Sequence, residues 1–98
     1  MMSNAIIGLC TLDLYLPGVS SLKEKRSILQ SLLKRIQNTF NASAAEVDYQ
    51  DVWQSAQIAV AVVTNATPHA DQMLTSILNW IETNFPHVSI VKQKIEIL

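Results

Sequence analysis

The sequence predicts an α+β fold in which two helices cover one face of a four-stranded antiparallel sheet, in the order β-α-β-β-α-β. Three observations lead to this prediction. Two segments repeat apolar residues at helical offsets of three and four positions. Four others are rich in β-branched and apolar residues, as strands are. Proline, glycine or polar residues interrupt the apolar pattern between these segments, as expected of turns and loops.

The first half of the chain predicts a strand, a helix and a second strand. Residues 5–16 are apolar and end at a Pro-Gly turn signal. Ser21 and Glu24 fit a capping box, with the serine as N-cap. The helix is expected over about residues 22–38, and residues 42–49 form a weaker, more polar strand. The apolar face of the helix comprises Leu22, Ile28, Leu29, Leu32, Leu33, Ile36 and Phe40.

The second half repeats the pattern. Residues 56–65 are almost continuously apolar, as expected of a central strand. Thr67 is expected to cap the second helix, with Pro68 at its first position. A later proline ends this helix, and residues 88–97 form the last strand. The apolar face of the second helix comprises Ala70, Met73, Leu74, Ile77, Leu78 and Ile81.

This element order is that of the ferredoxin-like, or split β-α-β, motif. We therefore expect residues 1–98 to form a single domain with strand order 4-1-3-2. In this topology the start of the first helix, the end of the second strand and the end of the second helix meet at one end, the upper end. Residues 23–26 should then lie near residues 48–53, and residues 84–87 should lie at the same end.

The composition limits the cellular locations and the kinds of binding partner that the sequence predicts. A net charge of −1 argues against nucleic-acid binding through overall charge, although a local basic patch is compatible with it. The single cysteine cannot form an internal disulfide. Residues 1–4 lack the features of a signal peptide, and no apolar stretch approaches the roughly 20 residues of a membrane span. We expect a cytoplasmic protein that does not enter a membrane.

The face of the sheet without helices, the open face, is expected to carry apolar side chains, because the strand at residues 56–65 is apolar on both phases. Water is a poor partner for such a surface. The sequence therefore predicts a homodimer or higher oligomer through the open face or an edge strand.

Basic residues are concentrated on the first helix. They are Lys23, Lys25, Arg26, Lys34 and Arg35, five of the seven in the chain. Lys23, Lys25, Arg26 and Lys34 are candidate contacts for an anion or RNA. Alternatively, Lys25 and Arg26 pair with Asp13, Asp48 or Asp51, and the nearby acids favour this interpretation. Lys25 lies inside the apolar stripe, so its stem should pack while its ammonium reaches past the helix end.

No catalytic, cofactor or metal site is predicted. Glu46 and Asp48 should point to one face of an edge strand and be solvated there. The two histidines and the cysteine are too far apart to form a metal or nucleophile site. We therefore expect the protein not to be an enzyme.

The two tryptophans are expected to be at least partly buried. Trp80 flanks the apolar face of the second helix. Trp53 either plugs the upper end of the core or forms an exposed contact, and the large area of its indole favours the plug. Trp53, Asp48 and Asp51 are candidates for an upper-end surface. RNA-binding sheets of the RRM type stack bases on aromatic residues of the two central strands. Here residues 56–65 contain no aromatic residue, so this mode is not expected.

Two segments, SLKEKR at residues 21–26 and AEVDYQDVW at residues 45–53, resemble the signature stretches of the YlxP-like family of small bacterial proteins. The resemblance extends over the chain, including residues 61–63 and 95–98. It implies a ferredoxin-like fold and a domain of unknown function. In some bacteria the family's genes lie among those for translation and ribosome maturation, which implies a ribosome- or RNA-associated role. The family supplies no catalytic residues.

Two hypotheses follow. The first is a non-enzymatic accessory protein of translation that contacts RNA or a ribosomal protein through Lys23, Arg26, Lys34 and the upper end. The alternative is an oligomeric regulatory module that binds a small anionic ligand near the start of the first helix.

Overall fold

The computed structural model describes residues 4–98 and confirms the ferredoxin-like α+β fold. Residues 1–3, from which the absence of a signal peptide was partly argued, lie outside the described residues. In residues 4–98 no helix is long and apolar enough to cross a membrane. The elements are β1 (Ile6–Tyr15), α1 (Leu22–Phe40), β2 (Ser43–Asp48), β3 (Ser55–Thr64), α2 (Thr67–Asn84) and β4 (Ser89–Ile97).

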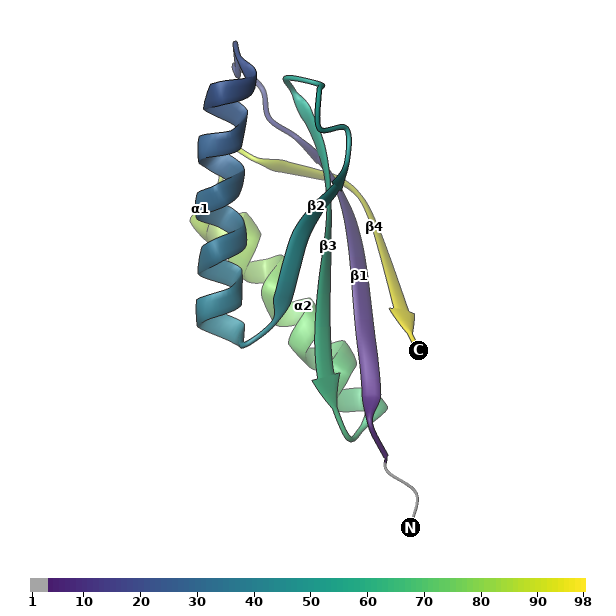
Figure 1. Ribbon diagram of the computed structural model, residues 1–98. Coiled ribbons are helices and arrows are strands. Elements are labelled where there is room, and N and C mark those ends of the chain that lie inside the picture. The colour runs from purple at the N-terminus through teal and green to yellow at the C-terminus, as the bar shows by residue number, and fades with distance from the viewer. Residues whose placement is uncertain (1–3) are drawn as a thin grey trace.

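The four strands form one antiparallel sheet in the order β2-β3-β1-β4, which is the predicted order read from the other edge. β1 and β3 lie at the centre and pair along their whole length, from Ile6 opposite Thr64 to Tyr15 opposite Ser55. Both helices cover the same face of the sheet (Figure 1). α1 packs on β2, whereas α2 packs on β1, β3 and β4.

The core lies between the sheet and the helices. Alternate residues of the two central strands point into it and are at most 2% exposed, among them Cys10, Leu12, Ile58 and Val60. Gly8 of β1 is also buried, because α2 approaches the sheet closely there. An added Cβ at Gly8 would lie 3.2 Å from the Cβ of Ala70 on the first turn of α2.

The two helix starts differ from each other. The predicted cap of α1 is confirmed, because the Ser21 Oγ accepts a hydrogen bond of 3.1 Å from the Glu24 backbone N–H. The cap predicted for α2 is wrong, because Ala66 is the N-cap and Thr67 is already helical. No side chain caps α2. Pro68 in the first turn fits this start, because the N–H groups of a first turn have no partner within their helix.

A β-bulge in β2 overturns the prediction that Glu46 and Asp48 share one face. The register shifts between them, so that Glu46 lies opposite Ile58 and Asp48 lies opposite Gln57. Ile58 is fully buried beneath the helices, whereas Gln57 lies on the opposite phase of the strand. Glu46 keeps the phase of Ala44 and points toward α1, whereas the one-residue shift turns Asp48 to the open face.

The open face is apolar at both ends and polar between them. Its exposed apolar residues include Ile7 and Val63 at the lower end and Tyr15 at the upper end. At its centre the Gln57 Nε2 donates a hydrogen bond of 2.8 Å to the Asp13 carboxylate. A shallow cavity of about 250 Å³ at this centre is lined by Thr11, Asp13, Gln57, Lys92, Lys94 and Glu96. The face therefore has apolar ends and charges of both signs.

Candidate functional site

Lys25 is fully buried in the first turn of α1, and three oxygens surround its ammonium. The Lys25 Nζ donates to the backbone carbonyls of Tyr49 at 2.5 Å and Val52 at 2.8 Å, and lies 3.0 Å from a Glu46 carboxylate oxygen. The two carbonyls accept hydrogen bonds from the ammonium, whereas the buried Glu46 oxygen is its ion-pair partner and accepts no hydrogen bond. The expected partners of Lys25, which were Asp13, Asp48 or Asp51, were wrong, because Glu46 lies on the side of β2 that faces α1 and the bulge turns Asp48 away. Glu46 is not solvated as expected, since its side chain is only 19% exposed.

This buried lysine holds the connection between β2 and β3, residues 49–54, against the start of α1. Tyr49 adopts a left-handed backbone conformation, with φ of 62°, and its carbonyl also accepts from the Val52 N–H at 3.0 Å. Tyr49, Val52 and Trp53 of this connection are exposed, and Tyr49 and Val52 line a cavity of about 470 Å³ with Tyr15 and Val91 of the sheet. Trp53 is 52% exposed, so the prediction that it plugs the core was wrong. We call residues 49–54 the display loop.

Lys23, Arg26 and Lys34 form an exposed strip along the outside of α1, which we call the basic ridge. The ion pairs in the described part of the chain join Lys25 to Glu46 and Lys94 to Glu96, so the ridge has none. The expected pairing of Arg26 with an aspartate is therefore wrong. Lys23 and Lys34 are eleven residues apart, or about 16 Å along the helix. The ridge is thus a line of cations that no carboxylate neutralises within ion-pair distance.

The acids predicted near the ridge face elsewhere. The Asp48 carboxylate accepts a hydrogen bond of 2.7 Å from the Tyr49 N–H and so helps to turn the display loop. Asp51 is exposed on the same loop. The predicted meeting of the first helix with residues 48–53 is confirmed, and Lys25 brings the two segments together.

Arg35 has a different role from the ridge. Its guanidinium lies 5.2 Å from the ring centre of Trp80 and 5.0 Å from that of Phe85. Trp80 also meets Phe40 edge to face, with ring centres 5.7 Å apart. The expected partial burial of Trp80 is confirmed. Arg35 therefore joins the lower half of α1 to the end of α2 through cation–π contacts.

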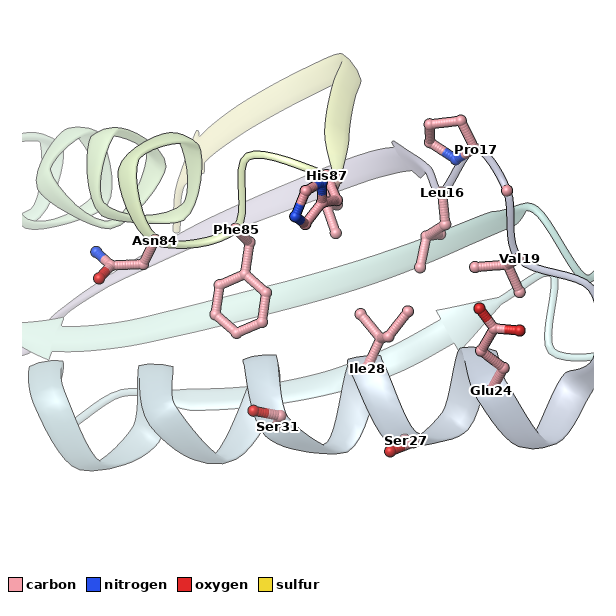
Figure 2. A pocket seen from close by; sticks show the side chains of 12 residues that line it. Leu16, Pro17, Val19, Glu24, Ser27, Ile28, Ser31, Asn84, Phe85 and His87 are labelled. Atoms are coloured by element: carbon pink, nitrogen blue, oxygen red, sulfur yellow. The ribbon is translucent and has the colours of Figure 1, made fainter.

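A groove of about 600 Å³, the upper groove, lies beside the first turns of α1. Figure 2 shows Leu16, Val19, Ile28 and Phe85 pointing into the space between α1 and the connection from α2 to β4. The groove exists because α2 ends beside the middle of α1 (Figure 1), which leaves the first turns of α1 without a neighbouring helix. The remaining lining residues are Pro17, Gly18, Glu24, Ser27, Ser31, Asn84, His87 and Val88. Sequence reasoning missed this site, and Pro86 was its only sequence signal.

Burial raises the pKa of the Cys10 thiol from 9.0 to about 11, so this side chain is protonated at neutral pH. Among the residues that the structure describes, no three His, Cys, Asp or Glu side chains lie together in a way that could hold a metal ion. The features that stand out are thus the basic ridge, the display loop and the upper groove, all in contact with α1.

Two comparisons with known proteins identify the family. Residues 7–95 match the family model described as "Protein of unknown function (DUF503)". The chain is also 35% identical over 83 residues to "Uncharacterized protein YlxP" of Bacillus subtilis (strain 168). This match covers 85% of the chain and 89% of that protein. The resemblance to the YlxP-like family is confirmed, and the chain belongs to the DUF503 family of proteins of unknown function.

Proposed function

We propose that this protein is a non-enzymatic accessory factor that binds RNA through the basic ridge and the adjacent display loop. The observation that supports the proposal is the ridge itself: Lys23, Arg26 and Lys34 are exposed and have no carboxylate partner among residues 4–98. The phosphate backbone attracts such a line of cations regardless of base sequence. Because the cations are clustered, a chain with a net charge of −1 can still offer a local basic surface.

The display loop favours a nucleic acid, rather than a small anion, as the binding partner. It exposes the aromatic rings of Tyr49 and Trp53, and Lys25 holds its backbone against the first turn of α1. Aromatic rings next to cations are the usual means of binding unpaired bases together with their phosphates. Lys25 fixes the backbone of this loop, so little order has to be gained on binding. We therefore expect single-stranded or looped RNA as the partner, and resemblance to the YlxP-like family suggests the ribosome as its setting.

The alternative, a small anionic ligand at the start of α1, has less support. The backbone N–H of Glu24 is already bonded to the Ser21 hydroxyl. The upper groove beside it is lined by the Glu24 carboxylate and by no lysine or arginine. A carboxylate at the mouth disfavours a ligand whose main feature is negative charge.

Charge reversal of the ridge tests the proposal. We expect Lys23→Glu/Arg26→Glu/Lys34→Glu to weaken binding to a fluorescent single-stranded RNA by roughly 100-fold or more, because three charged contacts are lost and repulsion replaces them. Ribosome co-sedimentation should be lost in parallel. Fluorescence anisotropy at low and moderate salt measures the first effect, and thermal melting checks that the variant is folded.

The matched control is Lys92→Glu/Lys94→Glu, which changes two exposed lysines of β4 away from α1. At protein concentrations below those at which the open face associates, this variant should bind RNA nearly as well as the wild type. Equal losses in the two variants, or no RNA binding by the wild type at all, would contradict the proposed function.

We also propose that the protein self-associates through the open face, on the side of the sheet opposite α1. Thr11 is midway between Ile7 at the lower apolar end and Tyr15 at the upper one. A two-fold axis near Thr11 would place the lower apolar end of one copy against the upper apolar end of the second copy. It would also allow Asp13 to meet a lysine of the second copy. The two ten-residue central strands span about 33 Å and four strands about 19 Å, or roughly 600 Å² per copy.

An interface of this size is near the lower limit for a stable dimer, so the association should depend on concentration. We expect light scattering at high micromolar concentration to give a dimer, and Ile7→Lys/Val63→Glu to give a monomer. Both positions are exposed, so the substitutions should not unfold the domain. A wild-type protein that remains monomeric under these conditions would rule out the interface.

A further inference from the structure

The upper groove has the size and lining of a site for a flat organic ring. Its volume of about 600 Å³ is in the usual range of small-molecule sites. Its interior is apolar, from Leu16, Val19, Ile28 and Phe85, and Glu24 and His87 lie toward its rim (Figure 2). Arg35 lies over the ring of Phe85, while Phe85 also lines the groove. An apolar interior with a few polar groups at its edge is typical of such sites.

The polar groups of the groove favour a ring that donates hydrogen bonds. Glu24 and His87 are its ionisable lining residues, and no lysine or arginine is among them. One oxygen of the Glu24 carboxylate accepts from the Ser20 backbone N–H at 3.3 Å and from its hydroxyl at 3.1 Å. A carboxylate has about four lone-pair sites, so acceptor capacity remains for a ligand.

The groove is adjacent to the cations of the basic ridge. Lys23, Ser27, Ser31 and Lys34 follow one another at offsets of four, four and three residues, which places them along one side of α1. The two serines line the groove, and the two lysines flank them on the ridge. A phosphate backbone that contacts both lysines therefore passes the mouth of the groove.

We infer that the upper groove takes one unstacked base of the bound RNA, and that guanine fits it best. This inference rests on the proposed function. Guanine carries an imino and an amino N–H donor side by side on its Watson–Crick edge, and a carboxylate accepts two such bonds in parallel. The apolar interior receives the ring, as in other proteins that hold splayed-out bases. Glu24 thus reads the base, and Lys23 and Lys34 hold the backbone.

Uncharged nucleosides test the groove without the ridge, because they carry no phosphate. In an NMR titration, we expect guanosine to shift the methyl signals of Val19, Ile28 and Val88 with a dissociation constant of about 1 mM, a fragment-like affinity. Adenosine, cytidine and uridine should bind roughly tenfold more weakly. Glu24→Gln should remove this preference, and Ile28→Trp should fill the groove and abolish the Val19 and Val88 shifts with all four nucleosides.

The matched control is Glu82→Gln, an exposed glutamate of α2 that does not line the groove, and it should retain the guanosine preference. Thermal melting checks the fold of Ile28→Trp, and Glu24→Gln provides a second test that leaves the core intact. Equal shifts with all four nucleosides, or none with guanosine, would overturn the inference. If RNA still bound through Lys23 and Lys34 in that case, the proposed function would stand without base insertion. Guanosine binding without any RNA binding would instead contradict the proposed function.

Discussion

Replacing Lys25 by methionine is expected to lower the free energy of unfolding by about 3–5 kcal/mol, as measured by urea denaturation followed by far-UV circular dichroism. The substitution keeps most of the buried stem and removes only the charged end. The Glu46 carboxylate then loses its cation, and the inward-facing carbonyls of Tyr49 and Val52 lose their donor. Unpaired polar groups in a buried position are costly, because no water replaces the lost partner.

Two further variants separate the terms of this cost. Glu46→Gln leaves both carbonyl bonds of Lys25 in place, so it should cost less, about 1.5–3 kcal/mol. Lys25→Met/Glu46→Met should lower the free energy of unfolding by less than the sum of Lys25→Met and Glu46→Met. Each single variant leaves one unpaired buried charge, whereas the double variant leaves none. Lys23→Met, at the exposed end of the same turn, is the control and should change stability by at most about 0.5 kcal/mol. A Lys25→Met variant as stable as Lys23→Met would show that the lysine does not organise the loop.

Replacing Gly8 by valine should destabilise the fold by about 3 kcal/mol, because α2 leaves no space for a side chain there. A Cβ alone would lie 3.1 Å from the Leu74 Cδ1, 3.2 Å from the Ala70 Cβ and 3.2 Å from the Val62 Cγ2. The leucine can rotate away, but the Cβ of Ala70 is attached directly to the helix backbone. Gly8→Ala should therefore cost less, about 1 kcal/mol, since some of the overlap is relieved and alanine suits a strand better than glycine.

Chemical denaturation of both variants checks this expectation, with Ala61→Val on the open face of the sheet as the control. Ala61 pairs with Leu9 outside the helix-covered core, so an added branch there should change stability little. Adding Ala70→Gly to Gly8→Val should recover part of the loss, apart from the usual cost of glycine in a helix. A Gly8→Val protein as stable as the wild type would contradict the close approach of α2.

The architecture could be predicted from the sequence because every helix and strand had a local sequence signal. Periodicity located the helices and strands, and Ser21 with Glu24 located the start of α1. Topology then brought the first turn of α1 to the connection after β2. These inferences needed only patterns within one element and the general rules of strand connection.

The detailed site could not be predicted in the same way, because it depends on register and on where elements stop. The bulge in β2 turns Asp48 away from α1 and leaves Glu46 facing it, and no residue pattern indicated this shift. Which of these two acids can pair with Lys25 follows from that one-residue shift, and Lys25 also holds the backbone of the loop that carries the exposed Trp53. The upper groove depends on the place along α1 at which α2 ends, which is a property of packing rather than of either helix alone.

These features divide the surface of α1 into parts with separate roles. Its inward side fixes the display loop through Lys25, its outer side carries the basic ridge, and its remaining side borders the upper groove. The proposed oligomer interface lies on the opposite face of the sheet from the basic ridge and the upper groove, and it borders the display loop, where Tyr49 and Val52 line a cavity with Tyr15. Contacts of RNA with the basic ridge are therefore compatible with self-association in one assembly.

The salt dependence of RNA affinity tests the central proposal most directly, because it counts the cations that contact phosphate. For single-stranded RNA, the slope of log K against log salt concentration is about −0.7 per contact, so three ridge cations predict a slope of about −2. Lys23→Gln/Arg26→Gln/Lys34→Gln should bring the slope close to zero, whereas Lys92→Gln/Lys94→Gln should leave it unchanged. A wild-type slope near zero, or one that the ridge substitutions do not alter, would contradict binding through the basic ridge.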